Sequence, residues 1–214
     1  MERPVDKLTG LISGAVIYPE MEALIARGSE FAVVFIDIDG LYAINRGFGR
    51  EAGDDVFRLI AGHIGDIFGD PSLAFRDARD EFVIVMPGGG KEDAFIKAER
   101  LRVLVCEERL GHTSADGIPL TQSISAGVSS FPDDGVRPDD VCRRAESAMI
   151  RAKKNGRNAV CLAREEKLIP KTSHYTRAQL EKLSVMSGKL NAGESALLRE
   201  ALDDLLKKYD VNDL

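Results

Sequence analysis

An acidic turn between two apolar runs does most to limit how this chain can fold. The runs are Leu73 to Phe75 and Phe82 to Met86, and the connection between them contains Asp80 and Glu81. Two apolar runs joined by a short polar segment predict paired strands. A third run, Phe31 to Ile38, is apolar enough for a strand that is buried on both faces. We therefore expect a central sheet built around these three strands.

A second group of acids ends the buried strand. Asp37 and Asp39 flank Ile38 at the end of that run. Carboxylates at the end of one strand and at the turn of a neighbouring hairpin can share a divalent cation, and an oxygen-only ligand set suits Mg²⁺ or Mn²⁺. Such a cation neutralises triphosphate charge and favours attack at phosphorus. Taken alone, Asp37 or Asp80 fits a solvated turn residue equally well, and that alternative stays open.

Helical patterns alternate with the strands. Apolar residues recur at helical spacing in four segments, and a further strand is predicted after the third of them. The helices are predicted at 21–27, 56–68, 95–105 and 138–154, and the strand at 120–129. This order predicts an α/β protein, more narrowly an α+β palm, in which helices flank a central, mostly antiparallel sheet.

Several short motifs follow one another along residues 6–162 and, together with the acidic hairpin, resemble the GGDEF family of diguanylate cyclases. Any one of them would be weak, but their order and spacing agree with the family. The motifs are Asp6-Lys7-Leu8-Thr9-Gly10-Leu11, Asp37-Ile38-Asp39, Asn45 followed by Gly49-Arg50-Glu51-Ala52-Gly53-Asp54, Ser125-Ala126-Gly127, and the helix end Lys153-Lys154-Asn155-Gly156-Arg157-Asn158.

The resemblance implies a metal site and a catalytic acid. Asp37 and Asp80 match the family's metal ligands, and the backbone carbonyl of Ile38 would complete the set. Glu81 matches the acid that helps to deprotonate the attacking 3′-hydroxyl. The implied reaction joins two GTP molecules into cyclic di-GMP, so two subunits must face each other and a homodimer is expected.

The resemblance also implies a nucleotide site. Asn45 and Asp54 match the residues that read the guanine edge, while Lys153 and Arg157 match the cations that hold the β- and γ-phosphates. Charge neutralisation of a triphosphate needs such cations. Two plainer interpretations remain open: Asp54 also fits a helix N-cap, and the two cations fit an ordinary helix end.

The sequence departs from the family at the turn itself. The two glycines of the GGDEF signature are replaced by Ala78 and Arg79. Glycine permits positive φ and close approach of the backbone to a ligand, so Arg79 either blocks the α-phosphate or folds along the phosphates and clamps them. The family's Phe-Lys pair is Leu41-Tyr42, which removes a further cation. Gly69-Asp70-Pro71-Ser72 replaces the R-x-x-D inhibition motif, so product feedback at that place is not expected.

Residues 165–214 have a different character from residues 1–164 and predict a separate module. Lys171 to Tyr175 is a candidate polar strand, and Thr176 with Gln179 fits a capping box before a first helix. A second helix follows the break at 188–193. Strand, helix, turn and helix resemble a ribbon-helix-helix domain, an intertwined dimer that inserts a two-stranded ribbon into a DNA groove. A helical hairpin that only dimerises is the alternative.

Composition restricts the remaining possibilities. The net charge of -6 argues against a surface that binds nucleic acid throughout, so any DNA contact has to be local. Three widely spaced cysteines suggest reduced thiols, and no apolar run reaches the roughly 20 residues of a membrane span, so we expect a cytoplasmic protein. Together with these limits, the resemblance implies a dimeric, Mg²⁺-dependent GTP-binding protein whose cyclase activity is weak or lost. The alternative is a DNA-binding regulator whose GGDEF-like domain senses a guanine nucleotide.

Overall fold

The chain divides into two compact units, residues 1–166 and 167–214, which are described separately. The computed structural model describes residues 4–69, 73–76, 80–163, 173–190 and 193–208. The boundary predicted between residues 164 and 165 lies outside the described residues. Within them, no helix is both long enough and apolar enough to cross a bilayer.

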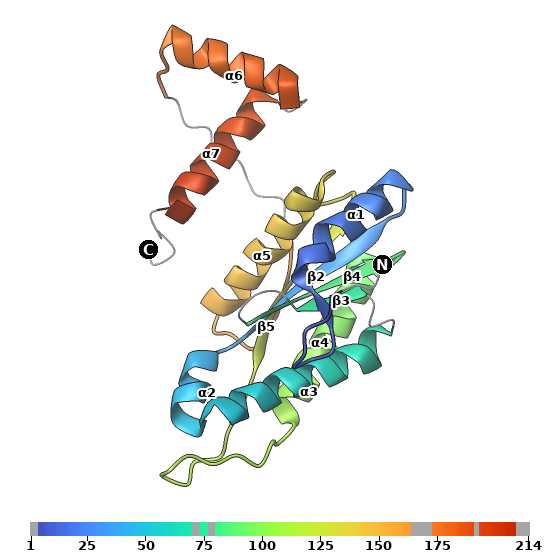
Figure 1. Ribbon diagram of the computed structural model, residues 1–214, viewed down its shortest axis with the longest axis vertical. Helices are drawn as coiled ribbons and strands as arrows, with labels where there is room; N and C mark the ends of the chain where they lie inside the picture. Colours follow the sequence, from blue (N-terminus) through green and yellow to red (C-terminus); the bar gives the residue numbers. More distant parts are fainter. Residues whose placement is uncertain (1–3, 70–72, 77–79, 164–172, 191–192, 209–214) are drawn as a thin grey trace. The chain divides into compact units, whose positions relative to one another are not determined.

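The first unit is built on one six-stranded sheet (Figure 1). Its strand order is β1-β3-β4-β2-β5-β6, and the three central pairings are antiparallel while the two edge pairings are parallel. The mostly antiparallel sheet is therefore confirmed. The strands are β1 (Ile12–Ser13), β2 (Phe31–Ile38), β3 (Ala74–Arg76), β4 (Glu81–Pro87), β5 (Ile124–Phe131) and β6 (Val160–Leu162).

Helices cover both faces of this sheet. The side chains of α3 and α4 pack in one apolar cluster, and those of α1 and α5 pack in a second cluster on the opposite face. The helices are α1 (Ile17–Ala26), which follows the short 3-10 turn Gly14–Val16, α2 (Leu41–Phe48), α3 (Arg50–Phe68), α4 (Lys91–Glu107) and α5 (Pro138–Lys154). The unit is a three-layer α/β fold with the sheet in the middle.

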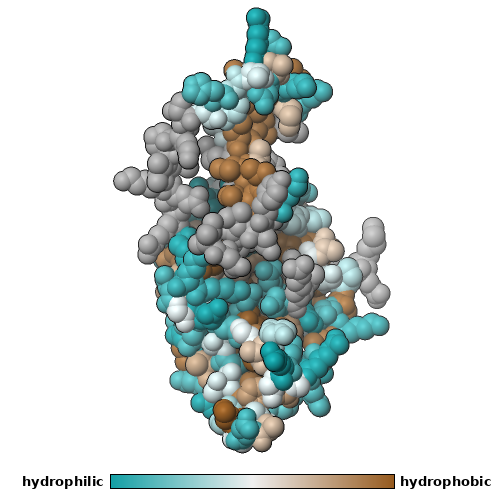
Figure 2. All heavy atoms as spheres, turned by 90° about the vertical axis from the view of Figure 1, so that its left-hand side faces the viewer, coloured by the Kyte–Doolittle hydropathy of each residue, from teal (hydrophilic) through white to brown (hydrophobic). Residues whose placement is uncertain are grey.

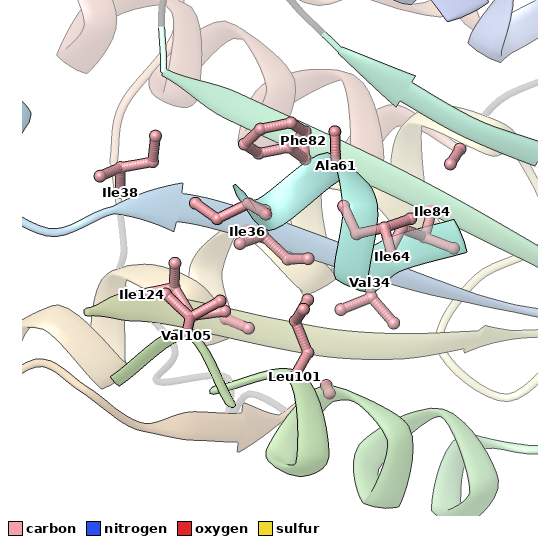
Figure 3. Packing of buried hydrophobic residues seen from close by; sticks show 14 of the residues in the cluster. Val34, Ile36, Ile38, Ala61, Ile64, Phe82, Ile84, Leu101, Val105 and Ile124 are labelled. Carbon is pink, nitrogen blue, oxygen red and sulfur yellow. The ribbon is translucent and has the colours of Figure 1, made fainter. Parts of the chain in front are cut away.

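Strand β2 shows how the two faces are divided. Val34, Ile36 and Ile38 point toward α3 and α4, where they meet side chains such as Ile64 and Leu101 (Figure 3). Since successive residues of a strand point to opposite faces, the alternate residues of β2 face α1 and α5. Asp37 continues that second series. The register of the strand therefore sends its carboxylate toward α5.

A glycine lets α5 lie directly on β5. A Cβ atom added to Gly127 would lie 1.9 Å from the backbone oxygen of Ala145 and 2.3 Å from the backbone nitrogen of Met149. Real Cβ atoms do not approach backbone atoms so closely, so only glycine fits between this strand and this helix. The glycine of the Ser125-Ala126-Gly127 motif thus has a packing role.

Most predicted elements are present, with differences in number and in where they begin. Helix α2 and the edge strands β1 and β6 were not predicted. Helices α1, α3 and α4 begin at Ile17, Arg50 and Lys91, each a few residues before the predicted apolar stripe, and β5 begins at Ile124 instead of residue 120. The late start of β5 has a side-chain cause. Nε2 of Gln122 donates hydrogen bonds of 2.8 and 2.7 Å to the carbonyl oxygens of Val105 and Glu108, which ties this segment to the end of α4.

The second unit contains two helices, α6 (Arg177–Leu190) and α7 (Glu194–Lys208), which contact each other. The predicted capping box is confirmed, because the amide of Gln179 donates to Oγ1 of Thr176 at 3.3 Å and the amide of Thr176 donates to Oε1 of Gln179 at 2.9 Å. Residues 173–176 form no strand in the single chain, and residues 171 and 172 lie outside the described residues. A two-stranded ribbon needs a second strand, which a second copy would supply.

Apolar side chains remain exposed on these two helices, and Figure 2 shows hydrophobic atoms gathered at the surface of this unit. Six of them are between 44% and 59% exposed: Leu180, Val185, Met186, Leu202, Leu205 and Leu206. Of the side chains described in this unit, Leu197 alone is buried. The unit therefore leaves much of its apolar surface uncovered.

Candidate functional site

A buried carboxylate and a lysine meet at the end of β2. Asp37 is 5% exposed, and Nζ of Lys153, in the last turn of α5, lies 2.6 Å from its Oδ2. Burial raises the pKa of Asp37, and the nearby carboxylates of Asp80 and Asp39 add repulsion, whereas the bond from Lys153 acts in the opposite direction. The pKa of Asp37 is raised overall. Further positive charge at this carboxylate would therefore stabilise its ionised form.

The acidic turn lies opposite the same strand end. Glu81 is the register partner of Asp37, and the amide of Ile38 donates to the carbonyl oxygen of Asp80 at 3.4 Å. The structure thus brings Asp37, Asp80 and Glu81 to one edge of the sheet, as the sequence predicted. Arg79 and Ala78 lie outside the described residues.

This edge offers an oxygen-only donor set to a cation. The described residues contain no group of three or more His, Cys, Asp or Glu side chains placed to hold a metal. The expected ligand set has only two acidic side chains, those of Asp37 and Asp80, and takes its third oxygen from the backbone carbonyl of Ile38. Mg²⁺ keeps several waters and is often bound by one or two carboxylates together with substrate phosphates. The residues present therefore fit a magnesium ion that is completed by a bound nucleotide.

Asn45 and Asp54 line one cavity of about 400 Å³. Its other lining residues are Leu41, Arg50, Phe57 and Arg76. Helices α2 and α3 approach each other closely here, because a Cβ atom on Gly53 would lie 2.0 Å from Oδ1 of Asn45. The glycine before Asp54 thus makes room for the Asn45 side chain. The sequence predicted that these two polar residues act together, and the helix pair brings them together.

The alternative interpretation of Asp54 as a helix N-cap is wrong. Helix α3 begins at Arg50, and its N-cap is Gly49, with φ of 91°. Asp54 lies inside the helix, beyond the positions where a side chain caps the first amides. Asn45 lies on helix α2. Both side chains therefore come from rigid elements.

The N-terminal motif holds Arg76, one of the residues that line this cavity, and the sequence did not predict this contact. Arg76 donates from Nη1 to Oδ1 of Asp6 at 2.8 Å, and its guanidinium lies 3.9 Å from the centre of the Phe57 ring. Burial raises the pKa of Asp6, but hydrogen bonds from Arg76 and Thr9 outweigh that effect and lower it overall. Asp6 and Arg76 are 70 residues apart. The opposite charges of Asp6 and Arg76 are the one feature of the sequence that could have indicated this contact. Many other pairs of residues in the chain also have opposite charges, so the feature does not identify this pair.

The two predicted phosphate-binding cations lie at the carboxyl end of α5. Lys153 is engaged with Asp37, whereas Arg157 is exposed and lies beyond the helix end with φ of 64°. Asn158, the next residue, has φ of 44°. Positive φ is uncommon for residues other than glycine, and two in succession make this a specific loop conformation. The loop carries Arg157 near the strand end that holds Asp37.

Two protein families match the chain. The model of the family described as diguanylate cyclase, GGDEF domain, matches residues 4–159, and that of the ribbon-helix-helix domain matches residues 167–210. Response regulator PleD of Caulobacter vibrioides is 34% identical over 160 residues, which are 72% of this chain and 35% of PleD. Diguanylate cyclase DgcP of Pseudomonas aeruginosa is 32% identical over 162 residues, 74% of this chain and 24% of DgcP. The chain thus spans about a third or a quarter of the length of these relatives.

Solved structures agree with the sequence matches. The active GGEEF domain of a diguanylate cyclase from Vibrio cholerae has a TM-score of 0.61 and 28% identity, over 71% of this chain and 94% of that one. The GGDEF domain of TpbB, also called YfiN, from Pseudomonas aeruginosa has a TM-score of 0.66 and 27% identity, over 75% and 94%. Both resemblances and the palm fold are thus confirmed, and the chain belongs to the GGDEF-domain family of diguanylate cyclases, with a ribbon-helix-helix domain after it.

Proposed function

We propose that the palm unit binds GTP together with Mg²⁺, and that its diguanylate cyclase turnover is reduced or abolished by the altered turn. The proposal depends on one observation: Asn45 and Asp54 line a single cavity, and this cavity is close in sequence to Asp37. Strand β2 ends one residue after Asp37, and helix α2 begins at Leu41, which also lines the cavity. The proposed guanine pocket thus lies next to the proposed cation site in the fold. A nucleoside triphosphate requires this arrangement, because its base and its phosphates must be bound at the same time.

The pocket chemistry favours guanine. The carboxylate of Asp54 accepts hydrogen bonds only, and guanine presents two adjacent donors, its N1–H and its 2-amino group. Adenine has an acceptor at N1, which would face the carboxylate without a proton between them. Asn45 can both donate and accept, so it can complete the recognition of the purine edge. A site that is built around such donors rejects an analogue that lacks them.

The sheet edge would hold the phosphates. Asp37, Asp80 and the Ile38 carbonyl are the proposed Mg²⁺ ligands, and the ion, when bound, supplies positive charge for the triphosphate. Lys153 and Arg157 would add charge at the β- and γ-phosphates. Glu81, which pairs in register with Asp37, is the proposed acid near the attacking hydroxyl. Cyclic di-GMP, the product, carries the same guanine edge and can occupy the same pocket.

The altered turn argues for low turnover. Ala78 and Arg79 replace two glycines, and a long side chain at such a turn would restrict the backbone and would compete for space with the α-phosphate. Leu41-Tyr42 removes a further cation, and Tyr42 is 78% exposed. The binding residues are kept while the turn is changed. We therefore expect nucleotide binding to survive better than catalysis.

Calorimetry tests the binding step. Titrating the full chain with GTP and Mg²⁺ should give heat, and ATP should bind more weakly by at least about tenfold because its edge leaves Asp54 unpaired. Asp54→Asn should reduce this preference, whereas Asp66→Asn, which changes an exposed acid further along α3, should leave it unchanged. Absence of GTP binding at high protein concentration would overturn the proposal.

Product analysis tests the turn. The chain is incubated with GTP and Mg²⁺, and the products are separated by chromatography. Ala78→Gly with Arg79→Gly should raise the yield of cyclic di-GMP if the turn is the defect. Arg79→Lys keeps the charge but not the planar guanidinium, and should behave like the wild type if bulk at the turn is what limits turnover. A double variant that binds GTP but stays inactive would place the defect elsewhere.

A second function, DNA binding by the C-terminal unit, is favoured by its match to the ribbon-helix-helix domain. Lys167, Lys171, Arg177 and Lys182 outnumber Glu181 in the segment that would form and follow the ribbon. Phosphate contacts make binding depend steeply on salt, so a titration with random duplex DNA should show a steep slope that Lys171→Ala flattens. Lys189→Ala, at the far end of α6, serves as the control. Salt-independent or absent binding would leave dimerisation as the role of this unit.

Both functions would use a homodimer. Joining two GTP molecules requires two palm units, and a second copy held through the C-terminal unit would raise their effective concentration. A regulator whose palm senses a guanine nucleotide would need the same assembly, since a ribbon has two strands.

A further inference from the structure

Asp39 accepts three hydrogen bonds from two parts of the fold, the start of β5 and the loop after α5. Oγ of Ser123 donates to Oδ2 at 2.8 Å, and Oγ of Ser125 donates to Oδ1 at 2.7 Å. The backbone amide of Asn158 also donates to Oδ2, at 3.0 Å. This one carboxylate therefore joins the end of β2, the start of β5 and the loop after α5. Hydrogen bonds to an ionised acceptor are stronger than neutral ones.

The third of these donors belongs to the loop that carries Arg157. Arg157 and Asn158 have φ of 64° and 44°, and neither is glycine. Residues in this region of φ/ψ space persist where the surrounding structure holds them. The bond from the Asn158 amide to Asp39 is such a restraint, and Asn158 is the residue that directly follows Arg157.

The side chain of Asn158 anchors the other side of the loop. Its Oδ1 accepts from Nη1 of Arg102 at 3.1 Å, and its Nδ2 donates to Sγ of Cys106 at 3.6 Å. Arg102 is itself held by Glu99, with Nε and Nη2 each within 3.0 Å of Oε2. The loop is thus fixed to β2 through its backbone and to α4 through its side chain.

We propose that Asp39 is a positioning residue for phosphate binding: by holding the Asn158 amide it fixes the left-handed turn that directs Arg157 toward the triphosphate. In this role Asp39 acts through the fold and does not touch the nucleotide or the metal: the three donors at its two oxygens all belong to the protein itself. Its neighbour Asp37, on the same strand end, has Lys153 as its partner and stays available to a cation. The two acids of the Asp37-Ile38-Asp39 motif then have different roles: Asp37 binds the cation and Asp39 positions the loop. The part of this inference that concerns phosphates rests on the proposed function.

Amide exchange tests the structural step without nucleotide. In the full chain, Asp39→Ala should speed hydrogen exchange at the Asn158 amide by at least about tenfold, since its acceptor is gone. Asp39→Asn should restore slow exchange, because the amide oxygen can accept from Asn158 and the amino group can donate to Ser125. Ser123→Ala removes another donor to the same Oδ2 but leaves the Asn158 bond, so exchange should stay slow. Unchanged exchange in Asp39→Ala would overturn the inference.

A comparison of nucleotides tests the positioning step. Asp39→Ala should weaken GTP binding about 10- to 100-fold, because a charge-assisted contact to the phosphates is misplaced. GMP, which has no β- or γ-phosphate, should lose less than about threefold. Asp39→Asn should recover GTP affinity, which a residue acting as a metal ligand or through its charge would not allow. Equal losses for GTP and GMP would show a merely structural role and would overturn the inference.

Arg157→Ala completes the test as a double-mutant cycle. In the wild-type background it should weaken GTP binding, whereas in the Asp39→Ala background it should add little, since Arg157 is already misdirected. Full additivity would overturn the inference while leaving the proposed function intact. If the wild-type chain bound no GTP, the proposed function would fall instead, and the exchange rates of Asn158 would still decide whether Asp39 holds the loop.

Discussion

The palm unit covers its apolar residues, whereas the C-terminal unit does not. Strand β2 has six fully buried apolar residues, and helices from both faces close over the sheet. In the C-terminal unit, by contrast, Leu202, Leu205 and Leu206 of α7 are each between 44% and 53% exposed. A two-helix unit cannot enclose two apolar faces by itself. The comparison shows that one unit covers its core within the chain, whereas the other leaves apolar side chains exposed, and we expect a second copy to cover them.

The two units also differ in where they keep polar groups. Besides exposed pairs such as Arg58 with Asp55, the palm has charged residues at strand and helix ends that are held by specific bonds. These are Asp37, Asp39 and Lys153. The C-terminal helices carry their polar residues at the surface, as in the exposed pair of Arg177 with Glu181. Surface pairs of that kind contribute little to stability. Specific chemistry is thus expected in the palm, and association in the C-terminal unit.

The largest expected effect is on association. Leu205→Glu places a charge where we expect a second copy to pack, and should raise the dimer dissociation constant by at least about a thousandfold. Two copies of the side chain are lost from a symmetric interface, each worth about 1.5 to 3 kcal/mol when fully buried. Light scattering after size-exclusion chromatography of the full chain measures the change in mass.

Ile96→Glu is the matched control for this substitution. Ile96 is an exposed apolar residue of the palm, 66% accessible on α4. The same change there should leave the mass of the particle unchanged. If Ile96→Glu dissociated the protein and Leu205→Glu did not, the palm would be the unit that requires a partner, and the comparison would be reversed.

The next largest effect concerns the palm core. Gly127→Ala should lower the free energy of unfolding by about 3 kcal/mol, because its Cβ atom would meet backbone atoms of α5 that cannot move aside. Gly62→Ala, at an exposed position of α3 with nothing within 4 Å, should raise it by about 0.5 to 1 kcal/mol. Urea unfolding measures both values. A tolerated Gly127→Ala would contradict the close contact between β5 and α5.

The pH dependence of stability gives a third, smaller effect in the palm. The pKa of Asp37 is raised above its ordinary value of 3.8, so the unfolded chain loses this proton first as the pH rises. The free energy of unfolding therefore decreases as the pH rises from about 3.8 to the raised pKa of Asp37 in the folded chain. Asp37→Asn, which cannot ionise, should lack this fall, and saturating Mg²⁺ should reduce it in the wild type. Urea unfolding between pH 4 and 7 provides the measurement.

Asp55 serves as a control of opposite sign. Hydrogen bonds from His112 and Arg58 lower the pKa of Asp55. The ionised carboxylate therefore stabilises the fold fully above the ordinary pKa of an aspartate, and this stabilisation is lost as the pH falls through the lowered pKa. Asp55→Asn should therefore alter the acid side of the profile. Identical profiles for Asp37→Asn and the wild type would contradict the burial of an ionisable carboxylate at the strand end.

Elements with a strong apolar pattern could be predicted from the sequence. Strand β2 and helix α5 have the predicted bounds, because nearly every residue of β2 is buried and α5 has a regular apolar stripe. Helix α2 was missed although Leu41, Ile44 and Phe48 recur at helical spacing, because its eight residues are fewer than the window in which such a period is recognised. Periodicity thus identifies long elements more readily than short ones.

The grouping of site residues was predictable, but their partners were not. Family motifs identified Asn45 and Asp54 as a pair, and the structure brings both to one cavity. The bonds that Arg76 donates to Asp6 and that Asn158 donates to Asp39 join residues 70 and 119 positions apart. Contacts at such separation depend on the packing of whole elements, which a local pattern does not encode.

The smallest expected effect is local to the C-terminal unit. Thr176→Ala removes the hydroxyl that accepts from the amide of Gln179, and the loss of such a cap costs about 1 kcal/mol. The helical signal of α6 and the stability of the dimer should decrease slightly, while the unfolding midpoint of the palm should stay the same. Thr176→Ser keeps the hydroxyl and should behave like the wild type. Circular dichroism during urea unfolding separates the two transitions, and a shift of the palm transition in Thr176→Ala would show that the two units fold as one.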